Sequence, residues 1–132
     1  MATTSNPYGL RPLNRVGGTA YAGATTQLPI ASAYATDIFY GDIVAVVAGG
    51  TIEKMGAVGT NAAPFTAGTI GVFMGCSYTD ATQGFIQRQY WPASTVASDA
   101  QAYIVDDPSV RFQIQADGQV PQTDLHQNMA IN

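Results

Sequence analysis

Residues 43–55 read IVAVVAGGTIEKM, and this stretch decides the fold class. The continuous apolar run at 43–48 is typical of a strand covered on both faces, and Ile52 then alternates with polar neighbours as in a half-buried strand. Between the two segments, Gly49 and Gly50 tolerate the positive φ angles that tight hairpin turns require. We therefore predict an antiparallel β-hairpin at this point of the chain.

The segment 69–78 is predicted to form another strand. Alternation gives it two faces, one carrying Ile70, Val72, Met74, Cys76 and Tyr78 and the other Gly71, Phe73, Gly75 and Ser77. The two glycines on the second face predict a bend or the close approach of another backbone, as at the corner of a barrel.

A second hairpin is predicted from residues 101–106 and 110–116. The sequence Asp106-Asp107-Pro108-Ser109 between them is typical of a type I turn, in which Asp precedes Pro. The second of these strands alternates cleanly, with Val110, Phe112, Ile114 and Ala116 expected to face inward and Arg111, Gln113 and Gln115 outward.

Shorter strand signals lie at 25–30 and 85–91, and Thr123 can cap a short helix over 123–131. No long amphipathic helix is visible. About six or seven short strands separated by turn signals indicate an all-β fold, a small antiparallel barrel or sandwich. We assign residues 25–132 to one β-rich domain.

Residues 1–24 are expected to form an extended N-terminal arm, because their Gly and Pro residues interrupt helix and strand periodicity. Spaced apolar residues in it suit contact with a surface. Two alternatives remain open: the arm lies across a partner protein, or it folds back on its own domain. A partner-binding arm predicts that deletion of residues 1–20 leaves a folded protein that no longer binds. Its contact residues are Tyr8, Leu10, Arg11 and Arg15, since arginine pairs bidentately with carboxylates.

Charge is sparse along the chain. Only 11% of residues are charged, against about 25% in an average soluble protein. Such a surface costs little to desolvate and suits a protein packed against neighbours, although a neutral secreted or viral protein without an assembly role has the same composition. The net charge is −4 and the basic residues are scattered, which argues against nucleic-acid binding; they are Arg11, Arg15, Lys54, Arg88 and Arg111.

Membrane, metal and disulfide sites are not expected. No run approaches the ~18 apolar residues of a membrane span, and the polar start lacks signal-peptide features, so we expect synthesis in a cytosol. Cys76 alone cannot form an internal disulfide, and its strand position indicates a small buried hydrophobe. Asp106 and Asp107 suggest calcium ligands, but a turn before Pro108 explains Asp107 more simply. We predict no cofactor.

Catalytic motifs are equally sparse. The single histidine, His126, stands among polar residues near the end of the chain, where it is expected to be a surface residue rather than a general base. The Gly-Gly pairs lack the Lys-Ser/Thr that completes a phosphate loop. The protein is therefore expected not to be an enzyme.

Tyr90-Trp91-Pro92 is the most conspicuous aromatic stretch, and Tyr90 and Trp91 are the remaining candidates for partner binding. Both faces of this strand mix apolar and polar groups, so it is either covered by its own core and a neighbour, or capped by its own loops. A sugar-binding surface is a further alternative.

Taken together, five stretches resemble small structural proteins of tailed bacteriophages. They are Asn6-Pro7-Tyr8-Gly9-Leu10-Arg11-Pro12, Ile38-Phe39-Tyr40-Gly41-Asp42, Tyr90-Trp91-Pro92-Ala93-Ser94, Tyr103-Ile104-Val105-Asp106-Asp107-Pro108 and Phe112-Gln113-Ile114-Gln115. The resemblance implies a capsid decoration (cement) protein with a β-rich fold that binds the major capsid protein on the head surface of the virion, commonly as a trimer. Such proteins continue past the region matching 123–132, which leaves open whether a neighbouring copy closes the barrel.

Three other functions remain open. The first is a head–tail connector or tail protein, the second is a carbohydrate-binding module that uses Tyr90 and Trp91, and the third and weakest is an enzyme. A particle map separates the first from a decoration protein by copy number, and a glycan array tests the second.

Overall fold

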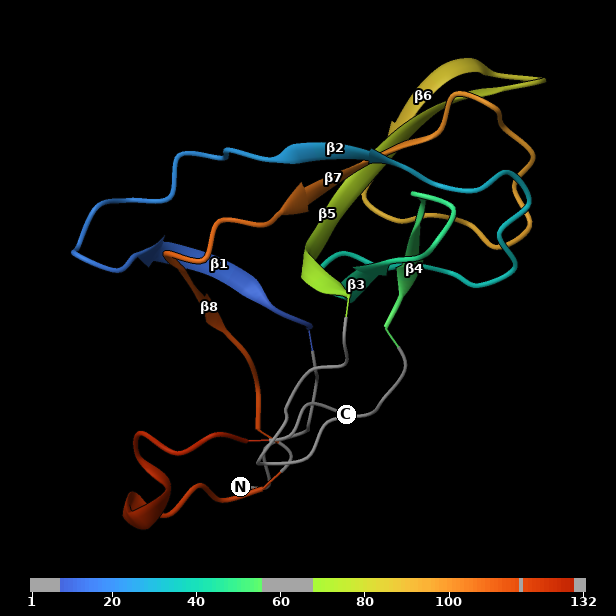
Figure 1. The fold of residues 1–132 in the computed structure, drawn as a ribbon. Coiled ribbons are helices and arrows are strands. Elements are labelled where there is room, and N and C mark those ends of the chain that lie inside the picture. Colours follow the sequence, from blue (N-terminus) through green and yellow to red (C-terminus); the bar gives the residue numbers. More distant parts are fainter. Residues whose placement is uncertain (1–7, 56–67, 117, 130–132) are drawn as a thin grey trace, which may run out of the picture.

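The computed structural model describes residues 8–55, 68–116 and 118–129. These residues form two antiparallel sheets, a two-stranded β1-β8 ribbon and a six-stranded sheet of order β2-β7-β5-β3-β4 in which β6 also pairs with β5 (Figure 1). The all-β prediction is confirmed. The strands are β1 (Arg11–Arg15), β2 (Thr26–Pro29), β3 (Ile43–Val46), β4 (Ile52–Lys54), β5 (Thr69–Asp80), β6 (Gly84–Arg88), β7 (Gln101–Val105) and β8 (Val110–Gln113).

The hairpin predicted around the two glycines is confirmed. Strands β3 and β4 pair antiparallel, with Val44 opposite Lys54. The loop is longer than two residues, because the Val47 N–H donates to the Thr51 carbonyl (3.0 Å) and the Gly50 N–H donates to the Val47 carbonyl (2.8 Å). Gly50 has φ +77°, the conformation for which glycine is suited.

The six-stranded sheet curls until its two edges meet, and we call this curled sheet the barrel. The edge strands are β2 and β4, and a parallel bridge joins Ile30, just after β2, to Ile52 in β4. This arrangement encloses the hydrophobic core. The largest fully buried side chains in it are Trp91, Tyr78, Phe73, Ile38, Ile52 and Ile104.

The two-faced alternation predicted for 69–78 is wrong in its second half. The register of β5 against β7 shifts between Phe73 and Gly75. This bulge adds a residue, so Phe73 packs in the same core as Cys76 and Tyr78 rather than opposite them. The close approach predicted at the glycines is confirmed: a Cβ on Gly71 would collide with the carbonyl oxygen of Val105.

The second predicted hairpin is also wrong. Strand β7 pairs with β2 and β5, whereas β8 pairs with β1 in the other sheet. The turn is present, with the Val110 N–H donating to the Asp107 carbonyl at 3.2 Å. It therefore acts as a corner that moves the chain between sheets. The predicted inward set also ends early, because Val110 is buried and Phe112 half-buried while Ile114 and Ala116 are exposed.

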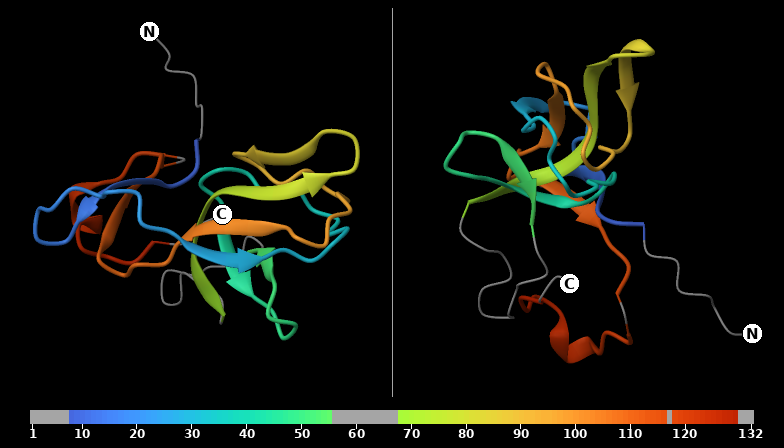
Figure 2. Two further views of the ribbon diagram at one scale, coloured as in Figure 1. Left: turned by 90° about the horizontal axis from the view of Figure 1, so that it is seen from above. Right: turned by 90° about the vertical axis from the view of Figure 1, so that its right-hand side faces the viewer.

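The N-terminal segment folds back on its own domain over residues 11–15, where β1 pairs with β8. Of the two alternatives for the arm, this stretch follows the second; residues 1–7 lie outside the described residues. The β1-β8 ribbon lies to one side of the larger sheet (Figure 2, left). Deleting residues 1–20 would therefore remove a strand together with the arm.

By contrast, the C-terminal segment after β8 is exposed. From Gln113 to Met129 every described residue except Asp124 is exposed. Among the described residues of this segment, the one helical element is a 3₁₀ turn at Gln122–Asp124 that follows Pro121, so Thr123 lies inside the turn and does not cap a helix.

Candidate functional site

Two glycines join the N-terminal segment to the turn after Ile38. The Leu10 N–H donates to the Gly41 carbonyl at 3.0 Å. Both Gly9 and Gly41 have positive φ angles (+72° and +90°), and a Cβ on Gly41 would lie 2.9 Å from the Leu10 nitrogen. Only glycine fits this conformation and this spacing without strain. The backbone contact therefore fixes Tyr8 beside the aromatic turn.

Two hydrogen bonds between Phe39 and Asp42 close the turn. The Asp42 N–H donates to the Phe39 carbonyl (3.0 Å), and the Phe39 N–H donates to the Asp42 carboxylate (2.8 Å). The Gly41 N–H donates to the carbonyl of Phe73 in β5 (2.8 Å), which ties the turn to the sheet. Phe39 and Tyr40 are thereby held on the outside of the barrel.

An open groove of about 680 Å³ runs past this turn, and we call it the aromatic groove. Phe39 and Tyr90 stack in it with ring centroids 6.2 Å apart, and they are 50% and 39% exposed. Four of the five stretches that carry the phage resemblance contribute to its lining. The lining residues are Tyr8, Gly9, Phe39, Tyr40, Asp42, Gln89, Tyr90, Ile114 and Gln115.

Three cations lie over the rings of the groove. The Arg11 guanidinium is 4.0 Å from the Tyr8 ring centroid, and Lys54 Nζ is 5.6 Å from that of Phe39. The Arg88 guanidinium is 5.6 Å from the Tyr90 centroid, and its Nη1 donates to the Tyr90 hydroxyl at 3.0 Å. Such pairs are attractive because the face of an aromatic ring is electronegative, and they hold each cation against its ring.

The adjacent residue, Trp91, is not part of the groove. Its side chain is 0% exposed, and its ring meets Tyr78 edge to face with centroids 5.3 Å apart. The Trp91 N–H donates to the Ile38 carbonyl (2.8 Å), and the Ile38 N–H donates to the Trp91 carbonyl (3.1 Å), which holds the backbone in place here. The interpretation of Trp91 as a partner-binding residue is therefore wrong, because alternation sends it inward when Tyr90 points outward.

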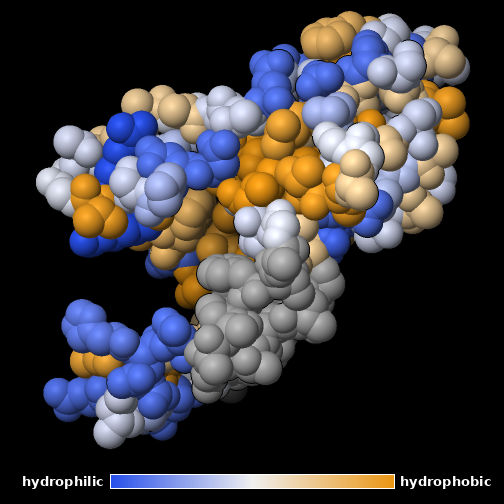
Figure 3. All heavy atoms as spheres, viewed as in Figure 1, coloured by the Kyte–Doolittle hydropathy of each residue, from blue (hydrophilic) through white to orange (hydrophobic). Residues whose placement is uncertain are grey.

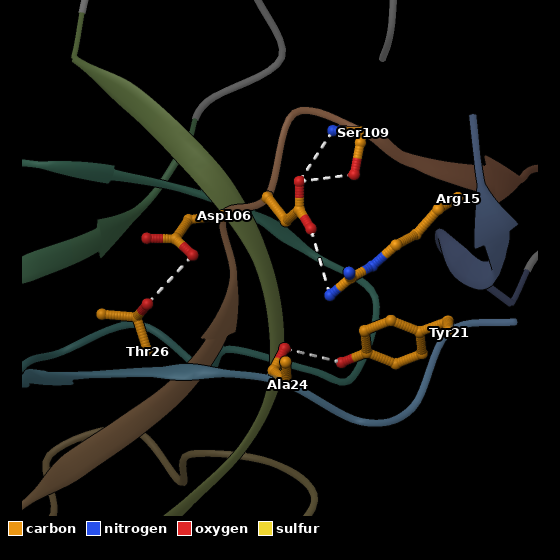
Figure 4. Close-up of polar contacts among 7 residues, drawn as sticks. Arg15, Tyr21, Ala24, Thr26, Asp106 and Ser109 are labelled. Carbon is orange, nitrogen blue, oxygen red and sulfur yellow. Dashed lines mark hydrogen bonds and ion pairs between the residues drawn. The ribbon is translucent and has the colours of Figure 1, made fainter. Parts of the chain in front are cut away.

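Arg15 and Leu10 also lie away from the groove. Arg15 forms an ion pair with Asp107 at 3.4 Å, at the corner between β7 and β8 (Figure 4). Asp107 accepts hydrogen bonds from the Ser109 N–H (2.9 Å) and hydroxyl (2.7 Å). These bonds, and then the charge of Arg15, lower the pKa of the Asp107 carboxyl. Arg15 thus joins the two sheets of its own chain.

Leu10 contributes to a second cavity, an apolar slot of about 360 Å³ between the two sheets. Apolar residues gather over this region in the centre of the face in Figure 3. Besides Leu10 its apolar lining includes Ile43, Ile70, Val72, Val105, Val110 and Phe112. The structure therefore brings Tyr8, Arg11 and Tyr90 together and leaves the other three candidates elsewhere.

Cys76 and His126, the residues considered for catalysis, have no catalytic arrangement in the described part of the chain. Cys76 is fully buried, and its thiol donates to the Tyr90 carbonyl (3.3 Å). Burial raises the pKa of this thiol to about 11, against a smaller opposing effect of Arg88, so it stays protonated at neutral pH. His126 is exposed. Within residues 8–55, 68–116 and 118–129, no three His, Cys, Asp or Glu side chains gather as metal ligands.

Sequence reasoning missed Phe39, Lys54 and Arg88 as site residues. The turn Phe39-Tyr40-Gly41-Asp42 was visible as a sequence motif, but its neighbours in space were not. Tyr8 and Phe39 come together only through the Gly9–Gly41 backbone contact, which joins segments 32 positions apart.

The groove offers aromatic rings and side-chain amides, with three cations over the rings, and aromatic residues and arginine are enriched at protein interfaces. Among the described residues, no helix is long and apolar enough to cross a membrane. No protein-family model, curated protein or solved structure matches this chain.

Proposed function

We propose that this chain is a non-enzymatic structural protein that decorates the head of a tailed bacteriophage. In this role it binds the assembled shell and braces adjacent subunits of the major capsid protein. The observation that carries the proposal is the aromatic groove, where four of the five stretches that resemble phage structural proteins meet.

Support also comes from the surface around the groove. Phe39, Tyr90 and Ile114 are large and apolar, and each is at least 39% exposed. Aromatic and apolar residues of this kind are enriched in interface cores, where charged residues are depleted. A chain with only 11% charged residues has few charges to desolvate on contact.

The proposed role is to stabilise the shell by binding to it. A protein that binds only the assembled shell stabilises it by mass action. Many copies on a symmetric lattice multiply a modest single contact, so moderate affinity at each groove suffices. We expect a homo-oligomer, most simply a trimer, because local three-fold positions recur over such a shell.

The test is binding to shells assembled from the major capsid protein of the same genome. We expect the chain to sediment with these shells and a particle map to show it on every capsomer. A single ring at one vertex would indicate a head–tail connector instead. Shells without the chain would contradict both roles.

Point variants replace the deletion of residues 1–20, since that deletion removes β1. Phe39→Ala combined with Tyr90→Ala should abolish co-sedimentation while leaving the fold intact. Phe85→Ala is the matched control, because Phe85 is 65% exposed and does not line the groove. Equal loss for Phe85→Ala would contradict the groove as the contact surface.

A carbohydrate-binding module remains the second candidate. The observation that favours it is the exposed Phe39–Tyr90 ring pair beside the side-chain amides of Gln89 and Gln115. Sugars stack on such rings and hydrogen-bond to such amides. Glycan-array binding that Tyr90→Ala removes would support it, whereas Trp91→Ala is no test because that side chain is buried.

A further inference from the structure

Positive charge is concentrated at the aromatic groove although the chain is acidic overall. Three of the five basic residues, Arg11, Lys54 and Arg88, lie over rings that line it, in a chain of net charge −4. The lining contains a single carboxylate, Asp42. Asp42 pairs with Lys54 at 3.0 Å. The groove therefore keeps two positive charges, those of the arginines, that its own acid does not neutralise.

The two arginines have no ion-pair partner in the described part of the chain. Neither Arg11 nor Arg88 lies within 4.0 Å of a carboxylate there, whereas Arg15 pairs with Asp107. Asp80 interacts with Arg88 electrostatically but forms no ion pair with it. Arg15 shows the contrasting arrangement, in which a carboxylate of the same chain pairs with the guanidinium.

Stacking prepares the two guanidinium groups for a carboxylate. A guanidinium held over a ring loses rotational freedom before a ligand arrives. Arg88 is fixed further by its bond to the Tyr90 hydroxyl at 3.0 Å. Arg11 is exposed, and its guanidinium lies 4.0 Å from the centroid of the Tyr8 ring. Planar, preorganised guanidinium groups bind carboxylates in pairs of parallel hydrogen bonds.

The rest of the lining suits a peptide segment rather than a single ion. The stacked rings of Phe39 and Tyr90 offer apolar surface to side chains, and the amides of Gln89 and Gln115 can bond to a peptide backbone. Aromatic-lined open grooves are a common way to recognise extended peptides.

We propose that the aromatic groove binds an acidic segment of a capsid subunit, with Arg11 and Arg88 as the carboxylate contacts. This inference rests on the proposed function and names the chemistry of its partner. The charge pattern also favours this orientation, since a chain of net charge −4 repels an acidic partner overall while the groove carries three of its five basic residues.

The experiment measures co-sedimentation of the full chain with assembled shells over a series of NaCl concentrations. Arg11→Gln combined with Arg88→Gln should weaken binding about tenfold or more and flatten its salt dependence. Arg111→Gln is the matched control, because Arg111 is exposed on β8 and, unlike Arg11 and Arg88, is not one of the cations over the rings of the groove. It should change binding little. If the double variant fails to fold, Arg11→Glu alone carries the test.

Competition separates the possible partners. Poly-L-glutamate should displace the wild-type chain from shells, and poly-L-glutamine should not. A double-stranded DNA fragment that competes as well as poly-L-glutamate would overturn the assignment to an acidic protein segment. Shell binding that survives unchanged in the arginine variants would overturn this inference and leave the decoration role intact, whereas no shell binding by the wild type would remove both.

Discussion

Two groups of aromatic residues in this chain differ in what covers them. Tyr78 and Trp91 meet edge to face inside the barrel, whereas Phe39 and Tyr90 stack on its outside. Tyr90 and Trp91 are neighbours in sequence, yet one belongs to each group. The difference shows that residue type does not decide the role here. The direction of the side chain from its strand does, so one group stabilises the fold and the other is available to a partner.

The largest effect should follow from a change in the buried group. Trp91→Ala leaves a cavity in the barrel and should lower the free energy of unfolding by about 3–5 kcal/mol. Tyr90→Ala should lower it by less than about 1 kcal/mol, because its ring is partly solvated. Urea denaturation of both variants measures the contrast. Equal losses would contradict the division into two groups.

A smaller effect is expected where two backbones of the core meet. Gly71→Ala places a Cβ against the carbonyl oxygen of Val105 and should destabilise the protein by about 3 kcal/mol. Gly49→Ala serves as the control, since nothing lies within 4 Å of its Cβ position. A chain that accepts both substitutions equally well would contradict the close packing of β5 against β7.

A smaller loss of stability is expected at the backbone contact that holds the segment of Tyr8 beside the turn of Phe39. Gly41→Ala strains a residue at φ +90° and pushes against Leu10, so we expect a loss of about 1–2 kcal/mol together with weaker shell binding. Gly17→Ala is the control for strain alone, because Gly17 has φ +104° in open space. Thermal melts and co-sedimentation measure the two effects. Shell binding that falls equally in both variants would contradict the role of the Gly9–Gly41 contact.

The smallest effect concerns the buried thiol. Because the raised pKa of Cys76 favours its protonated form in the folded state, this contribution to stability is fully present below pH 9 and is lost as pH rises toward 11. Denaturation between neutral pH and pH 11 should show the decline, and Cys76→Ala should reduce it. Rapid alkylation of the native protein at neutral pH would contradict the assignment of an inert thiol.

Local patterns predicted the parts of this fold that depend on local physics. The Gly49-Gly50 hairpin follows from an apolar run and two residues that tolerate positive φ, and the Asp107 turn follows from Asp before Pro. The pairing of the strands after that turn could not be predicted in the same way. A turn signal gives the reversal of the chain but not whether the next strand stays in the same sheet.

The site was predictable only in part, for a related reason. Tyr8, Arg11 and Tyr90 were candidates from the sequence, and they do lie at one groove. Trp91 was assigned to the same surface because two adjacent aromatic residues resemble a single patch. One bulge in β5 also brought Phe73 and Cys76, which alternation places on opposite faces, into the same core. Such a one-residue shift depends on long-range packing, which alternation alone does not encode.

The most direct test of the central claim is a cryo-electron microscopy map of decorated shells at a resolution that shows side chains. We predict that Phe39 and Tyr90 face a capsid subunit, with Arg11 and Arg88 against its carboxylates. A map in which the aromatic groove faces solvent, while another surface of this chain contacts the shell, would contradict it.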